Sequence, residues 1–279
     1  MRTAYYAAGA NAYAAGWRLR SLRRSRRVFL PRLARDPDAP ALVLSPHLDD
    51  AVISCWHVLT SVPHLRVVNV FAGIPPPGFV TRWDRACGAE ESAAHVRSRI
   101  DEDREILAAI GHEPEYFPFT DAQYTRRRPD QAALDAVLAE RLGSARAIFA
   151  PAGLGFAHGD HLLVRAYART LARHGMRVTL YADLPYAVRR GDWPRWIRDG
   201  GGAADGLRDW FWAPALRAVA PIRAVKIVAL PAQAARAKLA AMRGYATQFP
   251  GLDHDGRLSD PSIHGFEVYW TLGRGGRGG

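Results

Sequence analysis

The stretch Ala-Leu-Val-Leu-Ser-Pro-His-Leu-Asp-Asp, residues 41–50, decides the fold of this chain. Its first five residues, Ala41–Ser45, form a short apolar run with β-branched character, as expected of a strand buried in a parallel sheet. The polar residues that follow lead into a predicted helix over Asp50–Val62. A buried strand, a polar turn and a helix form the opening unit of an α/β fold.

Strands and helices continue to alternate along the chain. The sequence predicts further strands over Leu65–Phe71, Tyr116–Phe119, Arg146–Ala150, Arg177–Tyr181 and Val225–Leu230, and helices over Ala93–Ile110, Pro129–Leu142, His161–His174 and Ala232–Ala246. Gly111, Gly143 and Gly175 each follow a predicted helix as a C-terminal cap, and residues 72–92, rich in Gly and Pro, are predicted to be a loop. We therefore expect an α/β, Rossmann-like fold: a mostly parallel sheet with helices on both faces, which binds ligands beyond the carboxyl ends of its strands.

The net charge of +11 is concentrated at the amino terminus. Residues 1–35 contain nine arginines and no acidic residue, and the remaining 29 basic residues exceed the 27 acidic ones by only two. A basic arm can contact nucleic acid or an anionic membrane, whereas a poorly ordered, solvated leader is the simpler interpretation. We expect no nucleic-acid partner for the body of the protein.

The sequence also bears on export and membrane insertion. Residues 25–30, Ser-Arg-Arg-Val-Phe-Leu, are similar to a twin-arginine export signal, but no apolar stretch or cleavage site follows. The apolar runs are far shorter than the roughly 20 residues of a membrane helix. Two cysteines cannot form a disulfide framework. We expect a cytoplasmic protein with a basic leader (1–36), a single α/β domain (37–272) and a Gly/Arg-rich tail (273–279).

The first candidate site follows the first predicted strand. His47 and Asp50 are three residues apart at a strand-to-helix turn, so both side chains can face one point. Imidazole nitrogens and carboxylate oxygens are good zinc ligands. Asp49 should project differently and is free to act on a water molecule at the metal. Taken alone, however, two aspartates at a helix start equally suit a cap and a partner for the helix dipole.

The second candidate segment, His158-Gly159-Asp160-His161, follows the fourth predicted strand. It offers His161 as a third ligand, and three protein ligands with an open fourth position are typical of a catalytic zinc site. On their own, these histidines would suit an ordinary loop and helix start. Both segments lie at the carboxyl ends of strands in one sheet, and this combination favours a metal site.

These segments resemble the motifs of a known family. Residues 46–50, followed by Ser54, resemble the PHxDDxxxS signature of the PIG-L (LmbE-like) N-deacetylases, and residues 158–161 resemble their HxDH motif. Residues 99–102, Arg-Ile-Asp-Glu, resemble the family's RxxE helix, and Asp121 follows the third predicted strand, where members usually carry an aspartate. The resemblance covers roughly residues 41–165, with a weaker likeness around 238–248.

The resemblance implies a role for each matched residue. His47, Asp50 and His161 would be ligands of zinc, although iron(II) could occupy the same ligands. Asp49 would be the general base, and His158 would stabilise the oxyanion as an imidazolium or protonate the leaving amine.

Three further roles follow from the same resemblance. Asp160 would orient one of the histidines, as carboxylates around metal sites do. Arg99 and Asp121 would shape the substrate pocket, although Arg99 and Glu102 also suit a simple i,i+3 pair. The chain has Leu48 and Gly159 where members often have proline, and neither position supplies a reacting group.

Tryptophans are the best clue to the substrate. Trp83 lies in the predicted loop, and four more lie in irregular sequence: Trp193, Trp196, Trp210 and Trp212. Flat apolar rings suit the faces of sugars, but they equally suit packing onto the core. The expected activity is removal of an N-acetyl or other N-acyl group from an amino sugar or its glycoside, in secondary-metabolite or glycoconjugate biosynthesis.

A non-catalytic module that binds a nucleotide or sugar on the same fold is the alternative. Such a module has no need of three metal ligands and a spare carboxylate at Asp49. No glycine-rich phosphate-binding fingerprint follows the first predicted strand. The sequence leaves the oligomeric state open.

Overall fold

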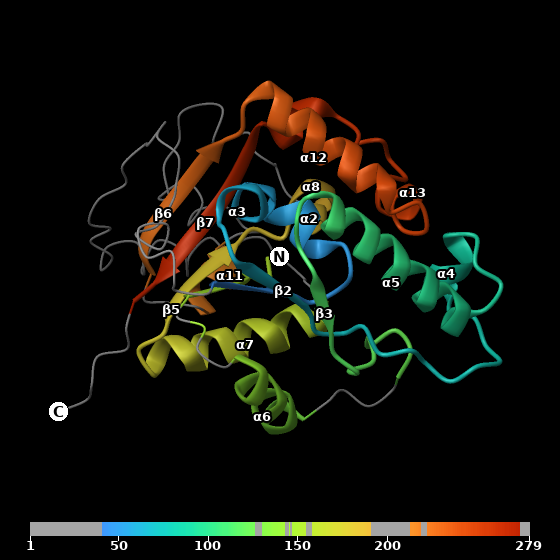
Figure 1. Ribbon diagram of the computed structural model, residues 1–279, viewed down its shortest axis with the longest axis horizontal. Coiled ribbons are helices and arrows are strands. Elements are labelled where there is room, and N and C mark those ends of the chain that lie inside the picture. Colours follow the sequence, from blue (N-terminus) through green and yellow to red (C-terminus); the bar gives the residue numbers. More distant parts are fainter. Residues whose placement is uncertain are drawn as a thin grey trace, which may run out of the picture.

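The computed structural model describes residues 41–125, 130–142, 145, 147–154, 158–190, 213–218 and 222–273. These residues form a seven-stranded sheet with helices on both faces (Figure 1), which confirms the predicted α/β class. The strands are β1 (Ala41–Ser45), β2 (Leu65–Asn69), β3 (Pro114–Tyr116), β4 (Ala147–Pro151), β5 (Arg177–Tyr181), β6 (Ile222–Ala229) and β7 (Phe266–Leu272). The predicted leader and residues 274–279 of the predicted tail lie outside the described residues.

The sheet is mostly parallel, as predicted. Its strand order is β3-β2-β1-β4-β5-β7-β6, and β1 pairs in parallel with β2 on one side and β4 on the other. At the centre, Val43 lies between Val67 and Phe149, and all three side chains are fully buried. The crossovers between β1, β2 and β4 therefore bring the carboxyl ends of these strands to one edge of the sheet.

The helices surround this sheet. They are α2 (Asp50–Ser54), α3 (Trp56–Ser61), α4 (Arg82–Ala86), α5 (Ser92–Ala109), α6 (Gln131–Leu142), α7 (Gly159–Arg173), α8 (Leu184–Arg190), α11 (Ala213–Ala218), α12 (Ala232–Gly244), α13 (Phe249–Leu252) and the 3₁₀ turn η2 (Pro261–Gly265). In Figure 1, α6 and α7 lie on one side of the sheet, and α2, α5 and α12 on the other. Among the described residues, no helix is long and apolar enough to cross a membrane.

Two of the predicted glycine caps are described. Gly111 and Gly175 have φ values of +84° and +88° directly after α5 and α7, in the left-handed region that favours glycine. Gly143 lies outside the described residues.

The single helix predicted over residues 50–62 is wrong, because the helix breaks at Cys55. The buried Glu267 carboxylate accepts hydrogen bonds from the backbone N–H groups of Trp56 and His57, each at 2.9 Å. It thereby caps the first turn of α3 in the manner of an N-cap acceptor. Lys238 Nζ, also fully buried, lies 2.7 Å from the same carboxylate and balances its charge.

Strand β7 is absent from the sequence prediction. It runs antiparallel between β5 and β6, and its neighbour β6 forms an edge of the sheet. The run Phe-Glu-Val-Tyr-Trp-Thr-Leu is rich in aromatic and β-branched residues, which is a strand signal that the strand–helix alternation obscures. The predicted loop over residues 72–92 also contains the short helix α4, which Thr81 begins by accepting a hydrogen bond from Asp84 N.

Candidate metal centre

A cavity of about 260 Å³ lies at the carboxyl end of the sheet. Its lining residues come from the turn after β1, from α4 and α5, from the loop after β3 and from the starts of α7, α8 and α13: His47, Asp49, Asp50, Trp83, Arg99, Asp121, Gln123, His158, Pro185, Tyr186, Gln248 and Leu252. We call His47, Asp49, Asp50, Asp121 and His158 the inner wall, and Trp83, Gln248 and Leu252 the outer wall. All the predicted site residues except Asp160 and His161 line this cavity, and those two are fully buried behind it.

The three predicted metal ligands converge on one point. Asp50 Oδ2 lies 3.2 Å from His47 Nδ1 and 3.1 Å from His161 Nε2. Donor atoms of all three residues lie within 4.8 Å of one another, and all three residues are buried. The arrangement therefore offers two imidazole nitrogens and one carboxylate oxygen to a single ion.

The hydrogen bonding of His161 matches that of a metal ligand. Its Nδ1 lies 2.5 Å from Asp183 Oδ1, so this nitrogen carries the proton and donates to the carboxylate. Its Nε2 is buried and has no hydrogen-bond partner among the described residues. A histidine that ligates through one nitrogen usually donates the other to a carboxylate, so these residues fit a divalent metal ion.

Asp183 was not predicted as a site residue. It is fully buried, and its second oxygen accepts a hydrogen bond from Leu154 N at 3.0 Å. It follows β5 by two residues, so the rule that ligand-binding groups lie beyond the carboxyl ends of strands could have found it.

The serines of the first segment fix its turn. Ser45 Oγ donates to His47 O at 2.6 Å and accepts from Ala51 N at 3.0 Å, which ties the end of β1 to the start of α2. Ser54 Oγ accepts from Leu184 N at 3.1 Å and so holds the residue next to Asp183. The serine that ends the motif thus supports the chain segment that orients His161.

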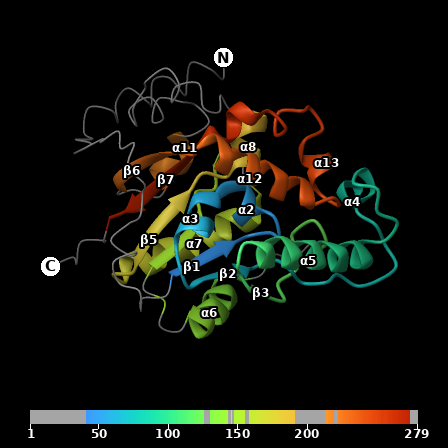
Figure 2. The same cartoon turned by 45° about the horizontal axis from the view of Figure 1, so that its top comes forward.

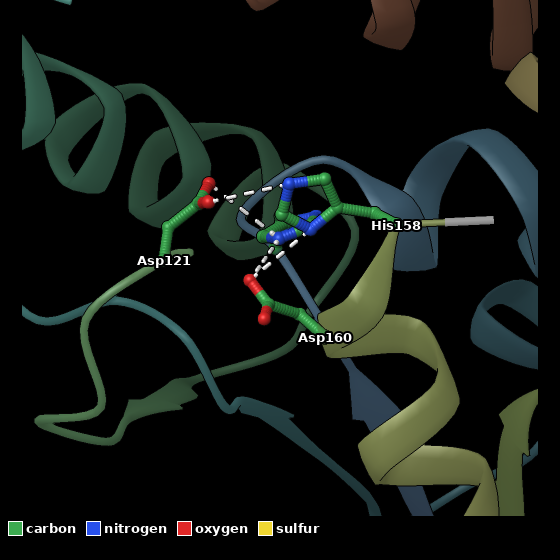
Figure 3. A group of neighbouring side chains, drawn as sticks. Asp121, His158 and Asp160 are labelled. Carbon is green, nitrogen blue, oxygen red and sulfur yellow. Dashed lines mark hydrogen bonds and ion pairs between the residues drawn. The ribbon is translucent and has the colours of Figure 1, made fainter. Parts of the chain in front are cut away.

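Nε2 of His47, the opposite ring nitrogen, faces a second group of polar side chains, of which Asp121, His158 and Asp160 are labelled in Figure 3. His47 Nε2 lies 3.2 Å from Asp160 Oδ2 and 3.5 Å from Asp121 Oδ2. His158 lies beside them, with Nδ1 3.2 Å from Asp160 Oδ2 and Nε2 3.7 Å from Asp121 Oδ1. Asp160 Oδ2 also accepts from Ala122 N at 3.0 Å, so this carboxylate joins both histidines to the loop after β3.

Buried carboxylates control the charge of the imidazoles. Burial alone would lower the pKa of His47, but Asp121, Asp160 and Asp50 outweigh it and raise this pKa well above its usual value. Burial likewise opposes the charge of His161, yet Asp50 and Asp183 raise its pKa to about 9. The polypeptide alone thus builds a strongly negative pocket that stabilises cations.

Asp49 and Arg99 both line the cavity, and the charge of each shifts the pKa of the other. Burial, together with the neighbouring Asp50, raises the pKa of Asp49 despite the opposing effect of Arg99. Burial would lower the pKa of Arg99, but Asp49, Asp121 and Asp84 contribute to raising it. Arg99 Nε is buried without a hydrogen-bond partner among the described residues, so this guanidinium retains a free donor beside the cavity.

The outer wall joins α4 to α13, which lie side by side in Figures 1 and 2. Trp83 Nε1 donates to Gln248 Oε1 at 3.0 Å, and Gln248 Nε2 lies 2.8 Å from His95 Nε2, to which an amide nitrogen can only donate. Both ends of this buried amide are therefore occupied, and the indole ring is fixed as a wall of the cavity. Gln248 was not singled out from the sequence.

Glu102 supports the same wall from α5. Its carboxylate accepts from Thr247 N at 3.0 Å and from Thr247 Oγ1 at 2.6 Å. The predicted alternative is an i,i+3 pair of Glu102 with Arg99. Instead, Arg99 lines the cavity, and Glu102 binds Thr247, the residue before Gln248. Trp193, Trp196, Trp210 and Trp212 lie outside the described residues.

The chain thus has an α/β domain built on a mostly parallel sheet. A buried His/Asp cluster at the carboxyl end of this sheet is suited to a divalent metal ion. Three solved structures of deacetylases share this fold. The A40926 pseudoaglycone deacetylase gives a TM-score of 0.62 at 23% identity, covering 85% of this chain and 98% of that one. A deacetylase of teicoplanin biosynthesis gives a TM-score of 0.60 at 22% identity and covers 86% of this chain and 100% of that one. Teicoplanin deacetylase in its zinc-inhibited form gives a TM-score of 0.59 at 20% identity, with the same coverage of both chains.

One curated relative is similar in sequence. The 2'-N-acetylparomamine deacetylase of Streptomyces fradiae is 31% identical over 185 residues, which is 56% of this chain and 64% of that protein. The chain therefore matches less than two thirds of the length of this relative. No family model matches the chain.

Proposed function

We propose that this chain is a zinc-dependent N-deacetylase of the PIG-L (LmbE-like) family that removes the acetyl group from an amino sugar or its glycoside. The proposal rests on one observation: three candidate metal ligands lie together, with a further carboxylate nearby that is not needed as a ligand. His47, Asp50 and His161 converge on one point, and Asp49 lines the cavity together with His47 and Asp50. Three ligands and a neighbouring base are the parts that metal-assisted hydrolysis requires.

The binding-module alternative explains less of this arrangement. A sugar or nucleotide can be held by neutral hydrogen-bonding groups, and it has no need of a histidine whose Nε2 is buried beside a carboxylate without a hydrogen bond among the described residues. Burying several carboxylates and imidazoles together is costly, and a bound cation would offset part of that cost. The site therefore favours an enzyme over a binding module.

The chemistry would be divided among the residues of this chain. A bound zinc ion would supply Lewis-acid activation of the water and the substrate carbonyl. Asp49 takes a proton from the water as its oxygen adds to the carbonyl carbon. His158 stabilises the negative charge on the carbonyl oxygen and gives a proton to the amide nitrogen as the C–N bond breaks. The products are acetate and the free amine.

The remaining residues position these groups. Asp160 holds the rings of His47 and His158, and Asp183 holds the ring of His161. Arg99 offers its free donor to the substrate, and Asp121 lies beside His158 at the cavity. These assignments give each predicted site residue a distinct task.

The outer wall supports a sugar substrate. Trp83 lines the cavity together with the charged residues of the inner wall. The cavity volume of about 260 Å³ is near the lower end of the ~300–1,000 Å³ range of small-molecule sites. It therefore suits one acylated ring, with the rest of a glycoside outside. The relative from Streptomyces fradiae acts, by its name, on 2'-N-acetylparomamine, an N-acetylated small molecule.

The test is a screen for acetate release from a panel of N-acetylated substrates. The panel holds N-acetylglucosamine, N,N'-diacetylchitobiose, 2'-N-acetylparomamine and an N-acetylated glycopeptide, each incubated with zinc-loaded or iron(II)-loaded protein. We expect acetate and a free amine from at least one member, loss of activity on chelation, and recovery when zinc is restored. The Asp49→Asn protein is the control for contaminating deacetylases. Binding of a panel member without any acetate release would support the binding-module alternative instead.

A further inference from the structure

We propose that the chain has a second, weaker divalent-cation site between Asp121 and His158, whose occupation inhibits the enzyme. It lies on the Nε2 side of the His47 ring, whereas Asp50, another proposed ligand, lies at Nδ1. The binding part of this inference is independent of the enzymatic activity. The inhibition part rests on the proposed function.

Each nitrogen of His47 faces a different group of metal-binding side chains. Nδ1 faces Asp50, at 3.2 Å, whereas Nε2 faces Asp160 and Asp121, at 3.2 and 3.5 Å. The second group, His47 with Asp121, His158 and Asp160, also has donor atoms within 4.8 Å of one another. One ring therefore separates two candidate cation positions.

A cation at the first position, on His47 Nδ1, would determine which nitrogen of His47 carries the hydrogen. With His47 Nδ1 ligating, its Nε2 carries the hydrogen and donates it to Asp160 Oδ2. Asp160 Oδ2 also lies 3.2 Å from His158 Nδ1, a contact without hydrogen-bond geometry. A hydrogen on Nδ1 would still face this carboxylate, which would leave the lone pair of His158 on Nε2, the nitrogen that faces Asp121.

The lone pair of His158 Nε2 faces Asp121 Oδ1 at 3.7 Å. Two ligands of a tetrahedral zinc ion, each about 2.1 Å from the metal, lie about 3.4 Å apart, so this pair needs only a small adjustment to hold one ion. Asp121 is itself oriented, because Gln123 N donates to Oδ1 at 2.9 Å and Gln123 Nε2 donates to Oδ2 at 3.2 Å. Figure 3 shows the carboxylates of Asp121 and Asp160 and the ring of His158 turned toward one another.

The second position is less buried than the first, so it should bind a cation more weakly and be accessible from the cavity. The first group is buried throughout, whereas the side chain of His158 is 33% exposed and lines the cavity. An ion there would have two protein ligands and complete its shell with water, against three protein ligands at the first position. The second position should therefore fill only after the first.

Occupation of this position would stop the proposed reaction. A cation on His158 Nε2 takes the lone pair that must carry the proton to the leaving amine, and it stands in the cavity where the acyl group would enter. Excess metal would then inhibit, while a single equivalent activates.

The experiment is a zinc titration of chelator-stripped protein followed by calorimetry and by metal analysis after equilibrium dialysis. We expect one tight equivalent and a second, weaker one in the wild-type chain. His158→Gln and Asp121→Asn should each lose the second equivalent and keep the first. His174→Gln is the matched control, because it removes an exposed histidine at the other end of α7 and should keep both. Circular dichroism verifies that the variants are folded.

Activity measured against free zinc gives the second readout. In wild type, it should rise with the first equivalent, fall as the second binds, and recover when a zinc buffer lowers the free ion. A second equivalent that persists in His158→Gln and Asp121→Asn, or a wild-type chain that binds a single ion at all concentrations, would overturn the inference. Absence of the first, tight equivalent would contradict the proposed function instead.

Discussion

The inner and outer walls of the cavity are held in place by different means. The inner wall is tied directly to the sheet, since His47 and Asp50 follow β1 and the turn is closed by Ser45 and by Asp50, which accepts from His47 N at 3.0 Å. The outer wall is formed by α4 and α13, two short helices joined by the side-chain contact of Trp83 with Gln248. Rigid strand ends can hold reacting groups accurately, and peripheral segments can change without disturbing them.

This difference separates two kinds of expected effect. Substitutions in the inner wall should lower kcat or metal affinity, because they remove reacting groups or ligands. Substitutions in the outer wall should change KM and substrate preference, because they move a binding surface.

The largest effect is expected for Asp49→Asn. The amide keeps the shape of the side chain but cannot take a proton, so kcat should fall by about 10²–10⁴-fold while the tight metal equivalent is retained. Asp50→Asn is the matched comparison one residue later, and it should lose the metal itself. Turnover and metal analysis of both proteins test this, and near-normal turnover of the Asp49→Asn protein would eliminate its role as a base.

His158→Ala should have the next largest effect. Loss of a single donor to a developing oxyanion costs about 2.7–4 kcal/mol, or about 10²–10³-fold in kcat. The tight metal equivalent and the dissociation constant of the substrate should be nearly unchanged, because His158 is absent from the three-ligand group. Loss of that equivalent in His158→Ala would make this histidine a ligand and reverse the proposed division of roles.

The sequence predicts the inner wall much better than the outer wall. His47, Asp50 and His161 could be found because each follows an apolar strand, and parallel strands bring their carboxyl ends together. Asp183 follows the same rule but lies in a segment without a recognised motif. The contact of His47 with Asp160 joins residues 113 apart in the chain, so only the fold shows which nitrogen faces which carboxylate.

The outer wall depends on contacts that no local pattern encodes. Glu102 and Thr247 are 145 residues apart, and Trp83 and Gln248 are 165 residues apart. The break at Cys55 has the same origin, because the capping carboxylate of Glu267 lies 211 residues from Trp56. Strand β7, which carries this carboxylate, was itself missed, so the break could not have been predicted.

Asp183→Asn should have a smaller effect, on metal affinity. The amide can still accept the hydrogen bond from His161 Nδ1, but it lacks the negative charge that makes the ring a better ligand. Loss of such a partner typically lowers metal affinity by about 10–100-fold. Competition with a chelator of known zinc affinity measures this. Asp101→Asn, on the exposed face of α5, is the control and should leave the affinity unchanged. Equal zinc affinities in Asp183→Asn and wild type would show that the 2.5 Å contact between His161 and Asp183 does not affect metal binding.

The smallest effect is expected at Gly251, in α13. A Cβ atom there would lie 2.7 Å from Cys87 Sγ and 3.2 Å from two ring carbons of Trp83, so alanine must displace the Cys87 thiol and should shift the indole ring in the outer wall. Loss of an aromatic contact with the sugar, worth about 0.5–1.5 kcal/mol, would raise KM by about 2- to 10-fold with little change in kcat.

Gly265→Ala is the matched control for this substitution. No heavy atom lies within 4 Å of a Cβ placed at Gly265, and its backbone conformation is open to alanine. It should therefore leave both kinetic constants unchanged, and Michaelis–Menten kinetics on the best substrate of the screen compare the two proteins. If Gly251→Ala lowered kcat by as much as it raised KM, the outer wall would be coupled to the reacting groups. If KM were unchanged, Trp83 would be a packing residue of the region between α4 and α13, which is the alternative that its sequence context leaves open.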